Sequence, residues 1–363
     1  MIEVEVHQQL RAFLRQQGEP YWHHHLTMAR LVARALRLGR SALIQTSAFS
    51  GYHERYRLSY LVPVLMWQAP VIVVASEAVQ QRLLMVEIPQ LRQWIRFPKS
   101  IQVGDRVPAG DFQGLLLTTP EAWLSDRLNP QGRFPDGVPT IIDGADDLET
   151  WARSQLTHHL QPADWDALML ACPEQCDVIR DARVQLTKAI FQHPANPYDC
   201  YLIEPPEQTL LQSFFQTLVP STSAISESPI VPVLPTPWQA FWNALQRQEA
   251  LTWATLTRQQ GAFSLHCGLA DIAAIMEPIW QQQPIVLVGG ALDLEAEATV
   301  YRQRLGVGDV TCLKFSPDRQ EELIQLYLPE KLPLPNTPQF QTALIQEMHT
   351  LLRVSSGTPG LTV

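Results

Sequence analysis

The segment "LIQTSAFSGYHERYRLSYLVPVLMW", residues 43–67, decides the fold. It begins with a short apolar run typical of a buried strand, and residues 58–67 form a mostly apolar helical pattern. A strand, a loop and a helix in this order frame the phosphate-binding loop of many nucleotide-binding domains. Here the loop at residues 46–57 contains one glycine and no lysine. The segment therefore predicts the framework of a nucleotide site without its usual phosphate-binding residues.

The composition is that of a globular protein with enough apolar residues for more than one core. The chain has 363 residues, of which 46% are hydrophobic, and this length suits two or three domains. No run of 18 or more apolar residues occurs, so we expect no membrane span. The N-terminal sequence is charged from Glu3 and lacks the apolar core of a signal peptide, which predicts a cytoplasmic protein.

Charge is distributed unevenly along the chain. The net charge is −9, yet residues 1–100 hold 12 Lys/Arg and 6 Asp/Glu, a net of +6, and the remainder holds 15 and 30, a net of −15. The overall acidity argues against a wholly basic nucleic-acid binder. The basic N-terminal third is compatible with contacts to phosphates or to the chain's own acidic part.

Strand and helix patterns alternate along residues 1–150, which predicts a parallel α/β domain. Residues 151–280 instead show helical patterns, interrupted by a Pro/Ser-rich linker at 219–237. Alternation resumes at about residues 281–296, which we expect to complete the first domain. Residues 297–363 then read as the incomplete beginning of a second α/β domain.

Six segments follow one another in an order that is itself informative. They are "LTMARLVARAL" (26–36), "LSYLVPVLMW" (58–67), "VIVVASEAVQQRL" (71–83), "LLLTTPEAWLSD" (115–126), "TIIDGADDLE" (140–149) and "PIVLVGGALDLE" (284–295). In this order they resemble the motifs of superfamily 2 DNA helicases of the DinG/XPD type, over nearly the whole chain. The resemblance implies a RecA-like domain of the P-loop NTPase type, a helical arch-like insertion at 151–280, and the start of a second RecA-like domain. It also implies ATP, Mg²⁺ and DNA as ligands.

The Walker A segment departs from the pattern of that family. A working loop needs several glycines, a lysine for the β- and γ-phosphates and a Ser or Thr for Mg²⁺. Here Gly51 is the single glycine, Tyr56 stands in place of the lysine, and Arg57 stands in place of the Ser or Thr. An arginine can still hold a phosphate through its charge, so Arg55 and Arg57 stay candidates for that role.

The other motifs also depart from the pattern of that family. The Asp-Glu-Ala-His of Walker B becomes Asp143-Gly144-Ala145-Asp146, so the glutamate that would polarise the attacking water is missing. Motif III reads Gly-Gly-Ala at 289–291, and His25 stands where the resemblance implies an adenine-binding glutamine. Residues 71–143 contain no cysteine, so we expect no iron–sulfur cluster.

The candidate site residues fall into two sets. The degenerate nucleotide site comprises His25, Gly51, Arg55, Arg57 and Asp143, and Asp143 is also the candidate Mg²⁺ ligand. Arg30, Arg34 and Arg37 share one helix face and are candidates for binding DNA phosphates, although a solvated helix face explains them equally well. We expect Asp146 or Asp147 to cap the helix that follows.

Three functions are compatible with this pattern. The first is a helicase-derived pseudoenzyme that has lost ATP hydrolysis, needs no cofactor, and binds single-stranded DNA or a protein partner. The second is an active ATP-dependent helicase or translocase with an atypical site. The third is a metal-dependent nuclease or hydrolase that uses the aspartates near residue 143. The loss of both the Walker A lysine and the Walker B glutamate favours the pseudoenzyme.

Overall fold

The computed structural model describes residues 1–17, 22–47, 56–95, 99–108, 110, 112–218, 234–247, 249–315, 328–329 and 331–355. The chain divides into two compact units. The first comprises Met1–Leu156 with Asp271–Glu321, and the second comprises Thr157–Ala270 with Glu322–Val363. Among the described helices, none is long and apolar enough to cross a membrane.

The first unit is built on a seven-stranded sheet in which all paired strands are parallel. Its strand order is β11-β1-β10-β5-β2-β4-β3. The strands are β1 (Ala42–Gln45), β2 (Val71–Val74), β3 (Ile101–Val103), β4 (Leu115–Thr118), β5 (Thr140–Asp143), β10 (Ile285–Gly289) and β11 (Thr311–Lys314). Five of them are buried along their whole length, as their unbroken apolar sequences predict. This sheet confirms the predicted α/β, RecA-like domain.

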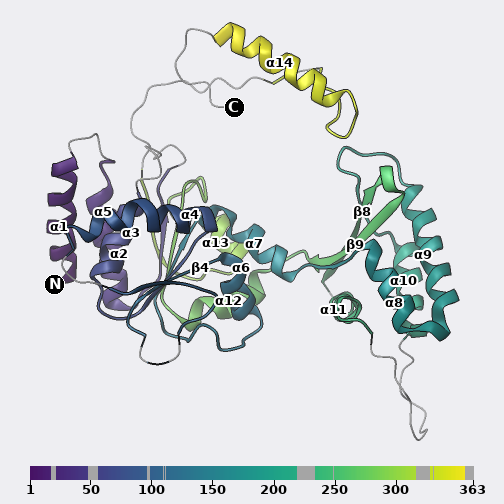
Figure 1. Ribbon diagram of the computed structural model, residues 1–363, viewed down its shortest axis with the longest axis horizontal. Helices are drawn as coiled ribbons and strands as arrows, with labels where there is room; N and C mark the ends of the chain where they lie inside the picture. Colours follow the sequence, from purple (N-terminus) through teal and green to yellow (C-terminus); the bar gives the residue numbers. More distant parts are fainter. Residues whose placement is uncertain are drawn as a thin grey trace, which may run out of the picture. The chain divides into compact units, whose positions relative to one another are not determined.

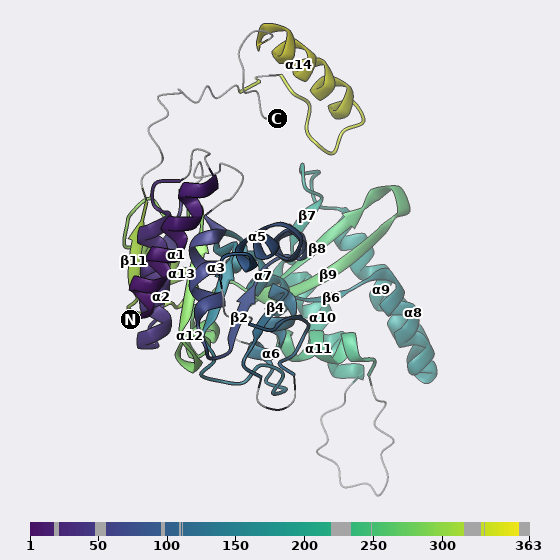
Figure 2. The same cartoon turned by 60° about the vertical axis from the view of Figure 1, so that its left-hand side comes forward.

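Helices cover both faces of the sheet (Figures 1 and 2). One face packs into a continuous apolar core with α1 (Ile2–Gln17), α2 (His25–Leu38), α3 (Arg57–Met66) and α4 with η1 and α5 (Glu77–Arg92). The remaining helices of the first unit are α6 (Pro120–Leu128), the short η2 (Ala145–Asp147), α7 (Leu148–Leu156), α12 (Ala273–Gln282) and α13 (Thr299–Leu305). Helix α2 ends after residue 38, where Gly39 adopts a left-handed backbone (φ 59°).

Lys99 fixes the C-terminal end of α3. Its ammonium group donates to the backbone carbonyls of Val64, Trp67 and Ala69 at 3.2, 2.8 and 2.6 Å. The carbonyl of Val64 is in the last turn of the helix and that of Trp67 follows it directly, where the helix dipole favours a cation. Burial lowers the pKa of Lys99 to about 8. This anchor matters because the other end of α3 carries the Walker A residues.

The stretch after residue 297 differs from the predicted boundary. We expected it to open a second α/β domain, but β11 pairs in parallel with β1, from Ala42 opposite Thr311 to Gln45 opposite Lys314. The first unit therefore continues to Glu321. The local pattern specified a strand correctly but carried no information about its neighbour in the sheet.

The second unit contains a sheet that the sequence patterns did not predict. Four antiparallel strands follow the order β6-β9-β8-β7: β6 (His158–Leu160), β7 (Cys200–Leu202), β8 (Ala250–Thr257) and β9 (Ala262–Leu269). The helical reading of 151–280 was wrong for the two long strands, in which buried and exposed side chains alternate. Threonines and Trp253 in β8 also favour a strand.

Helices account for most of the rest of the second unit. They are α8 (Pro162–Ala171), η3 (Pro173–Gln175), α9 (Cys176–Phe191), α10 (Pro205–Leu218), α11 (Thr236–Leu245) and α14 (Phe340–Ser355). Its core contains fully buried Trp165 and Trp238, whose rings meet edge to face at 4.8 Å. Trp238 also packs on Phe215 and donates from Nε1 to the carbonyl of Asp164 at 2.8 Å. The core of this unit is separate from that of the first unit.

Trp238→Ala should therefore destabilise the second unit selectively. Removing a buried tryptophan costs about 3–5 kcal/mol, and the carbonyl of Asp164 loses its donor. In thermal unfolding followed by limited proteolysis, we expect cleavage within 157–270 at a lower temperature and unchanged protection of 57–156. Leu170→Ala, which alters an exposed side chain, is the matched control. Equal loss of protection in both units would contradict two separate cores.

Candidate functional site

Three neighbouring strands bring their C-terminal ends together at one edge of the first sheet. The register places Gln45 of β1 opposite Gly289 of β10, and Val288 of β10 opposite Asp143 of β5. In parallel α/β sheets, ligands bind outside the carboxyl ends of the strands. The ends of the Walker A, Walker B and motif III strands therefore meet at this edge of the sheet, as the resemblance implies. Two of the predicted site residues, Gly51 and Arg55, lie outside the described residues.

Asp143, the last residue of β5, accepts three side-chain hydrogen bonds. The Tyr56 hydroxyl donates to Oδ1 at 2.7 Å. Arg57 Nε and the Tyr60 hydroxyl donate to Oδ2 at 2.6 and 2.8 Å. All three donors lie at the start of α3. Residues 56, 57 and 60 are within about one helical turn of each other, so their side chains can reach the same carboxylate. Asp143 is thus joined directly to the Walker A helix.

The Arg57–Asp143 contact is a buried ion pair. The Arg57 side chain is 4% exposed and the Asp143 side chain 0%. A charge at such a depth is tolerated only when it is paired and hydrogen-bonded, and the guanidinium supplies both. Burial, with the Asp143 charge beside it, raises the pKa of Tyr60 well above its usual value, so its hydroxyl stays a donor.

This arrangement does not fit a magnesium nucleotide. In a working site the Walker A Ser or Thr and the Walker B Asp approach each other through a metal ion. Here the guanidinium of Arg57 contacts Asp143 directly, at the place where the metal ion would lie between the two residues. The Asp143 carboxylate already accepts hydrogen bonds from three donors. Within the described residues, no group of three His, Cys, Asp or Glu side chains is placed to hold a metal ion.

Gly144 stands at the position where the resemblance implies a catalytic glutamate. Its backbone is left-handed (φ 89°), and a Cβ placed there would approach Trp151 to 3.1 Å. Residues other than glycine rarely adopt this conformation. A glutamate at residue 144 would therefore strain the backbone of the turn after β5.

Asp146 links the Walker B turn to motif III. Its carboxylate accepts from the backbone N–H groups of Gly290 and Ala291 at 2.8 and 2.9 Å. A Cβ at Gly289 would lie 2.7 Å from Asp146 Oδ2, so this approach requires a glycine. We expected Asp146 or Asp147 to cap the following helix; for Asp146 the structure shows a long-range link instead, which the local sequence pattern did not reveal.

Gln45 joins the end of β1 to the loop after β10. Its side-chain amide donates to the carbonyl of Glu295 at 2.9 Å and accepts from the backbone N–H of Asp293 at 3.0 Å. Thr46 adds a backbone bond to Gly289 at 2.8 Å. Neither Gln45 nor Tyr60 was among the residues predicted for the site. The signal for Tyr60 was its spacing of four residues from Tyr56, which places both hydroxyls on one helix face.

His25 lies in the core between α2 and α3. Its side chain is 1% exposed, and its Nδ1 is 2.7 Å from the Ser59 hydroxyl. Trp22 meets the imidazole edge to face at 5.4 Å. The ring therefore ties two helices together and offers little surface to an adenine.

The three candidate arginines of α2 are all exposed. Arg37 binds the carboxylate of Glu3 in α1, with Nη2 and Oε1 2.7 Å apart. Arg30 and Arg34 lie seven and three residues before it, on the same helix face. Arg37 is therefore already paired with a carboxylate of the protein. Arg30 and Arg34 are exposed and are the two that we consider further for binding phosphates.

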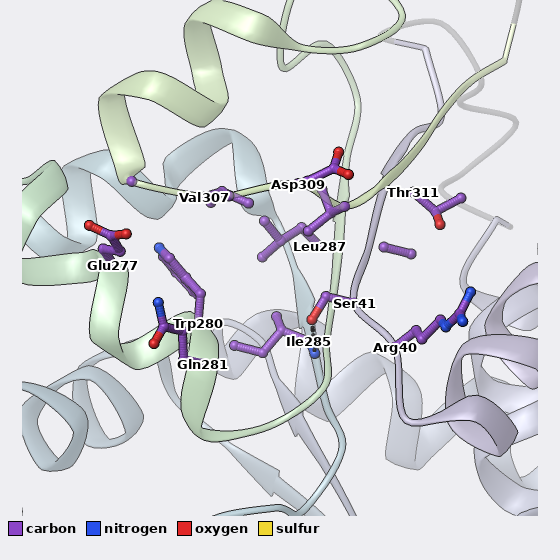
Figure 3. A pocket seen from close by; sticks show the side chains of 14 residues that line it. Arg40, Ser41, Glu277, Trp280, Gln281, Ile285, Leu287, Val307, Asp309 and Thr311 are labelled. Atoms are coloured by element: carbon purple, nitrogen blue, oxygen red, sulfur yellow. Dashed lines mark hydrogen bonds between the residues drawn. The ribbon is translucent and has the colours of Figure 1, made fainter.

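A cavity of about 530 Å³ lies at the opposite end of the strands (Figure 3). It is lined by the residues before and at the start of β1, β10 and β11, among them Arg40, Ser41 and Ile285. Trp280 of α12 forms one wall and is held by a bond from Nε1 to the carbonyl of Leu305 at 2.7 Å. This cavity does not belong to the nucleotide-site framework.

Comparison with solved structures assigns the fold. The structure of S. tokodaii Xpd4 matches with a TM-score of 0.51 and 10% sequence identity, over 92% of this chain and 68% of that one. An apo XPD and an XPD helicase give TM-scores of 0.47 and 0.48 at 11% identity, over 81% and 82% of this chain. This chain covers 58% and 62% of those two chains.

The sequence matches no protein-family model and no curated protein. The Xpd4 comparison nevertheless shows that the chain has an XPD-like helicase fold. This confirms the XPD side of the resemblance predicted from six short segments. At this level of identity the likeness concerns the fold, so the activity of the protein must be argued from its own residues.

Arg57→Ala should destabilise the first unit strongly. It leaves the buried Asp143 carboxylate without its countercharge, and breaking a buried ion pair costs about 3–5 kcal/mol. The free energy of unfolding from chemical denaturation is the measurement, with Arg34→Ala, an exposed arginine, as the control that changes it by less than about 0.5 kcal/mol.

A second variant separates charge from packing. Arg57→Met combined with Asp143→Leu and Tyr60→Phe removes both charges and the buried hydroxyl that Asp143 accepts from, and keeps apolar volume, so it should recover most of the loss. Equal stability of Arg57→Ala and Arg34→Ala would show that the ion pair has no structural role.

Proposed function

We propose that this protein is a helicase-derived pseudoenzyme, which has lost ATP hydrolysis and acts by binding a partner through its XPD-like scaffold. The single observation that carries the proposal is the contact of Asp143 with Arg57, Tyr56 and Tyr60. A protein side chain thereby supplies the positive charge that a metal ion supplies in an active site. The chain covers 68% of Xpd4, and the activity of a whole helicase is not transferred to it.

Two further observations support the loss of hydrolysis. The left-handed backbone at Gly144 disfavours a glutamate at the position that polarises water. The carboxylate of Asp146 is engaged with the motif III backbone. Both features stabilise the fold and neither requires a nucleotide. We infer that selection has preserved the scaffold, and that the strand ends now serve its rigidity.

We propose single-stranded DNA as the partner to test first. Arg30 and Arg34 are exposed on α2, and residues 1–100 carry a net charge of +6. Phosphate contacts from such residues give affinity without reading sequence. A protein partner is the alternative outcome, and it needs no basic row.

The protein should neither bind nor hydrolyse ATP in a magnesium-dependent way. Calorimetric titration with Mg²⁺–ATP should give no saturable heat in the micromolar range. Phosphate release with single-stranded DNA present should equal that of buffer, and an active XPD-type helicase in the same assay is the positive control. Micromolar affinity with measurable turnover would instead establish the atypical active helicase.

Binding to a single-stranded oligonucleotide should persist without ATP and weaken as salt is added. In anisotropy titrations, Arg30→Ala with Arg34→Ala should reduce the slope of log affinity against log salt by about 1 per lost contact. Arg180→Ala, an exposed arginine of α9, is the matched control. If the wild-type protein does not bind DNA at all, the partner is a protein.

A further inference from the structure

One face of the sheet in the second unit carries a pair of histidines outside the nucleotide-site framework. His159 of β6 and His266 of β9 are directly opposite each other in the antiparallel register. Their Nδ1 atoms are 2.9 Å apart. Residues on either side, such as Leu160 and Leu265, are buried in the core, so the two imidazoles lie on the outer face by strand alternation.

We propose that His159 and His266 form a binding site for a divalent transition metal ion, with Cu²⁺ and Ni²⁺ as the ions that fit best. Imidazole nitrogens are ligands that these ions favour. The proposal is independent of the pseudoenzyme function, because it concerns residues of the second unit only.

The two nitrogens already interact with each other. Their separation of 2.9 Å is that of a hydrogen bond between the rings, so one Nδ1 donates a proton to the other. A metal ion that binds both nitrogens replaces this shared proton, and the donor ring takes its other neutral tautomer. For a given set of nitrogen ligands the affinity is highest for Cu²⁺, above Ni²⁺ and Zn²⁺.

The other ring nitrogen of His266, Nε2, is hydrogen-bonded to a residue of β8. Its Nε2 lies 2.8 Å from the Thr255 hydroxyl. When Nε2–H donates to this oxygen, the lone pair of Nδ1 is directed at His159. A partner of this kind on the outer nitrogen is the usual arrangement around metal-bound histidines.

Trp253 fixes the ring plane and supplies a reporter. It is opposite His266 in the register, and the two rings are stacked with an interplanar angle of 10° and centroids 5.3 Å apart. His158 is adjacent in sequence but lies on the other face, opposite Cys267. Among the described residues the site therefore has two protein ligands, and water or a donor from a partner completes the coordination.

The test uses the full chain and CuCl₂. Titration followed by tryptophan fluorescence and by electron paramagnetic resonance should reveal one saturable equivalent of Cu²⁺ with two equatorial nitrogens. Ni²⁺ should bind at the same site, and Zn²⁺ should bind more weakly. His159→Gln and His266→Gln should each lose this equivalent while keeping the secondary structure of the wild-type protein in circular dichroism. Trp253→Phe should keep the equivalent and lose most of the fluorescence quenching.

His23→Gln is the matched control, because it removes an exposed histidine from the three consecutive histidines at 23–25. It should keep the equivalent of Cu²⁺. The proposal is overturned if wild-type protein binds no saturable equivalent, if His159→Gln and His266→Gln bind as wild type does, or if His23→Gln abolishes binding. Zn²⁺ binding as tight as Cu²⁺ binding would overturn the predicted preference for Cu²⁺.

Discussion

The buried ion pair between Arg57 and Asp143 is the constraint on which the first unit depends. It ties the start of α3 to the end of β5, while Lys99 holds the other end of the same helix. In a nucleotide-driven protein the positive charge at this place arrives and leaves with the ligand. Here it is part of the chain, because the Arg57 guanidinium is bonded to the Asp143 carboxylate. A helix fixed at both ends is suited to holding a binding surface still.

Much of the fold could be predicted from the sequence, because burial imposes strong patterns on parallel strands. The unbroken apolar run at β2 and the helix stop at Gly39 both follow from local chemistry. The order of six short motifs was enough to indicate the XPD-like fold. The family resemblance also grouped Asp143 and Arg57 in one degenerate nucleotide site, and the two side chains are in contact in the structure.

The remaining features depend on contacts between distant residues. Nothing local distinguishes a strand that joins the first sheet from one that opens another domain, so β11 was assigned to the wrong unit. The alternation in β8 was overlooked beside the strong helical pattern of α11. Asp146 reads as a helix cap, and only the three-dimensional structure brings its carboxylate to Gly290, which is 144 residues away.

The turn at Gly144 limits the substitutions that this end of the sheet tolerates. The pattern of the helicase family would place a glutamate at residue 144 and a small hydroxyl residue at 57. The first change strains a left-handed backbone against Trp151, and the second leaves Asp143 without its countercharge. Each change taken alone therefore lowers stability. The glycine and the arginine restrict the sequences that this strand end accepts, the glycine through backbone conformation and the arginine through charge.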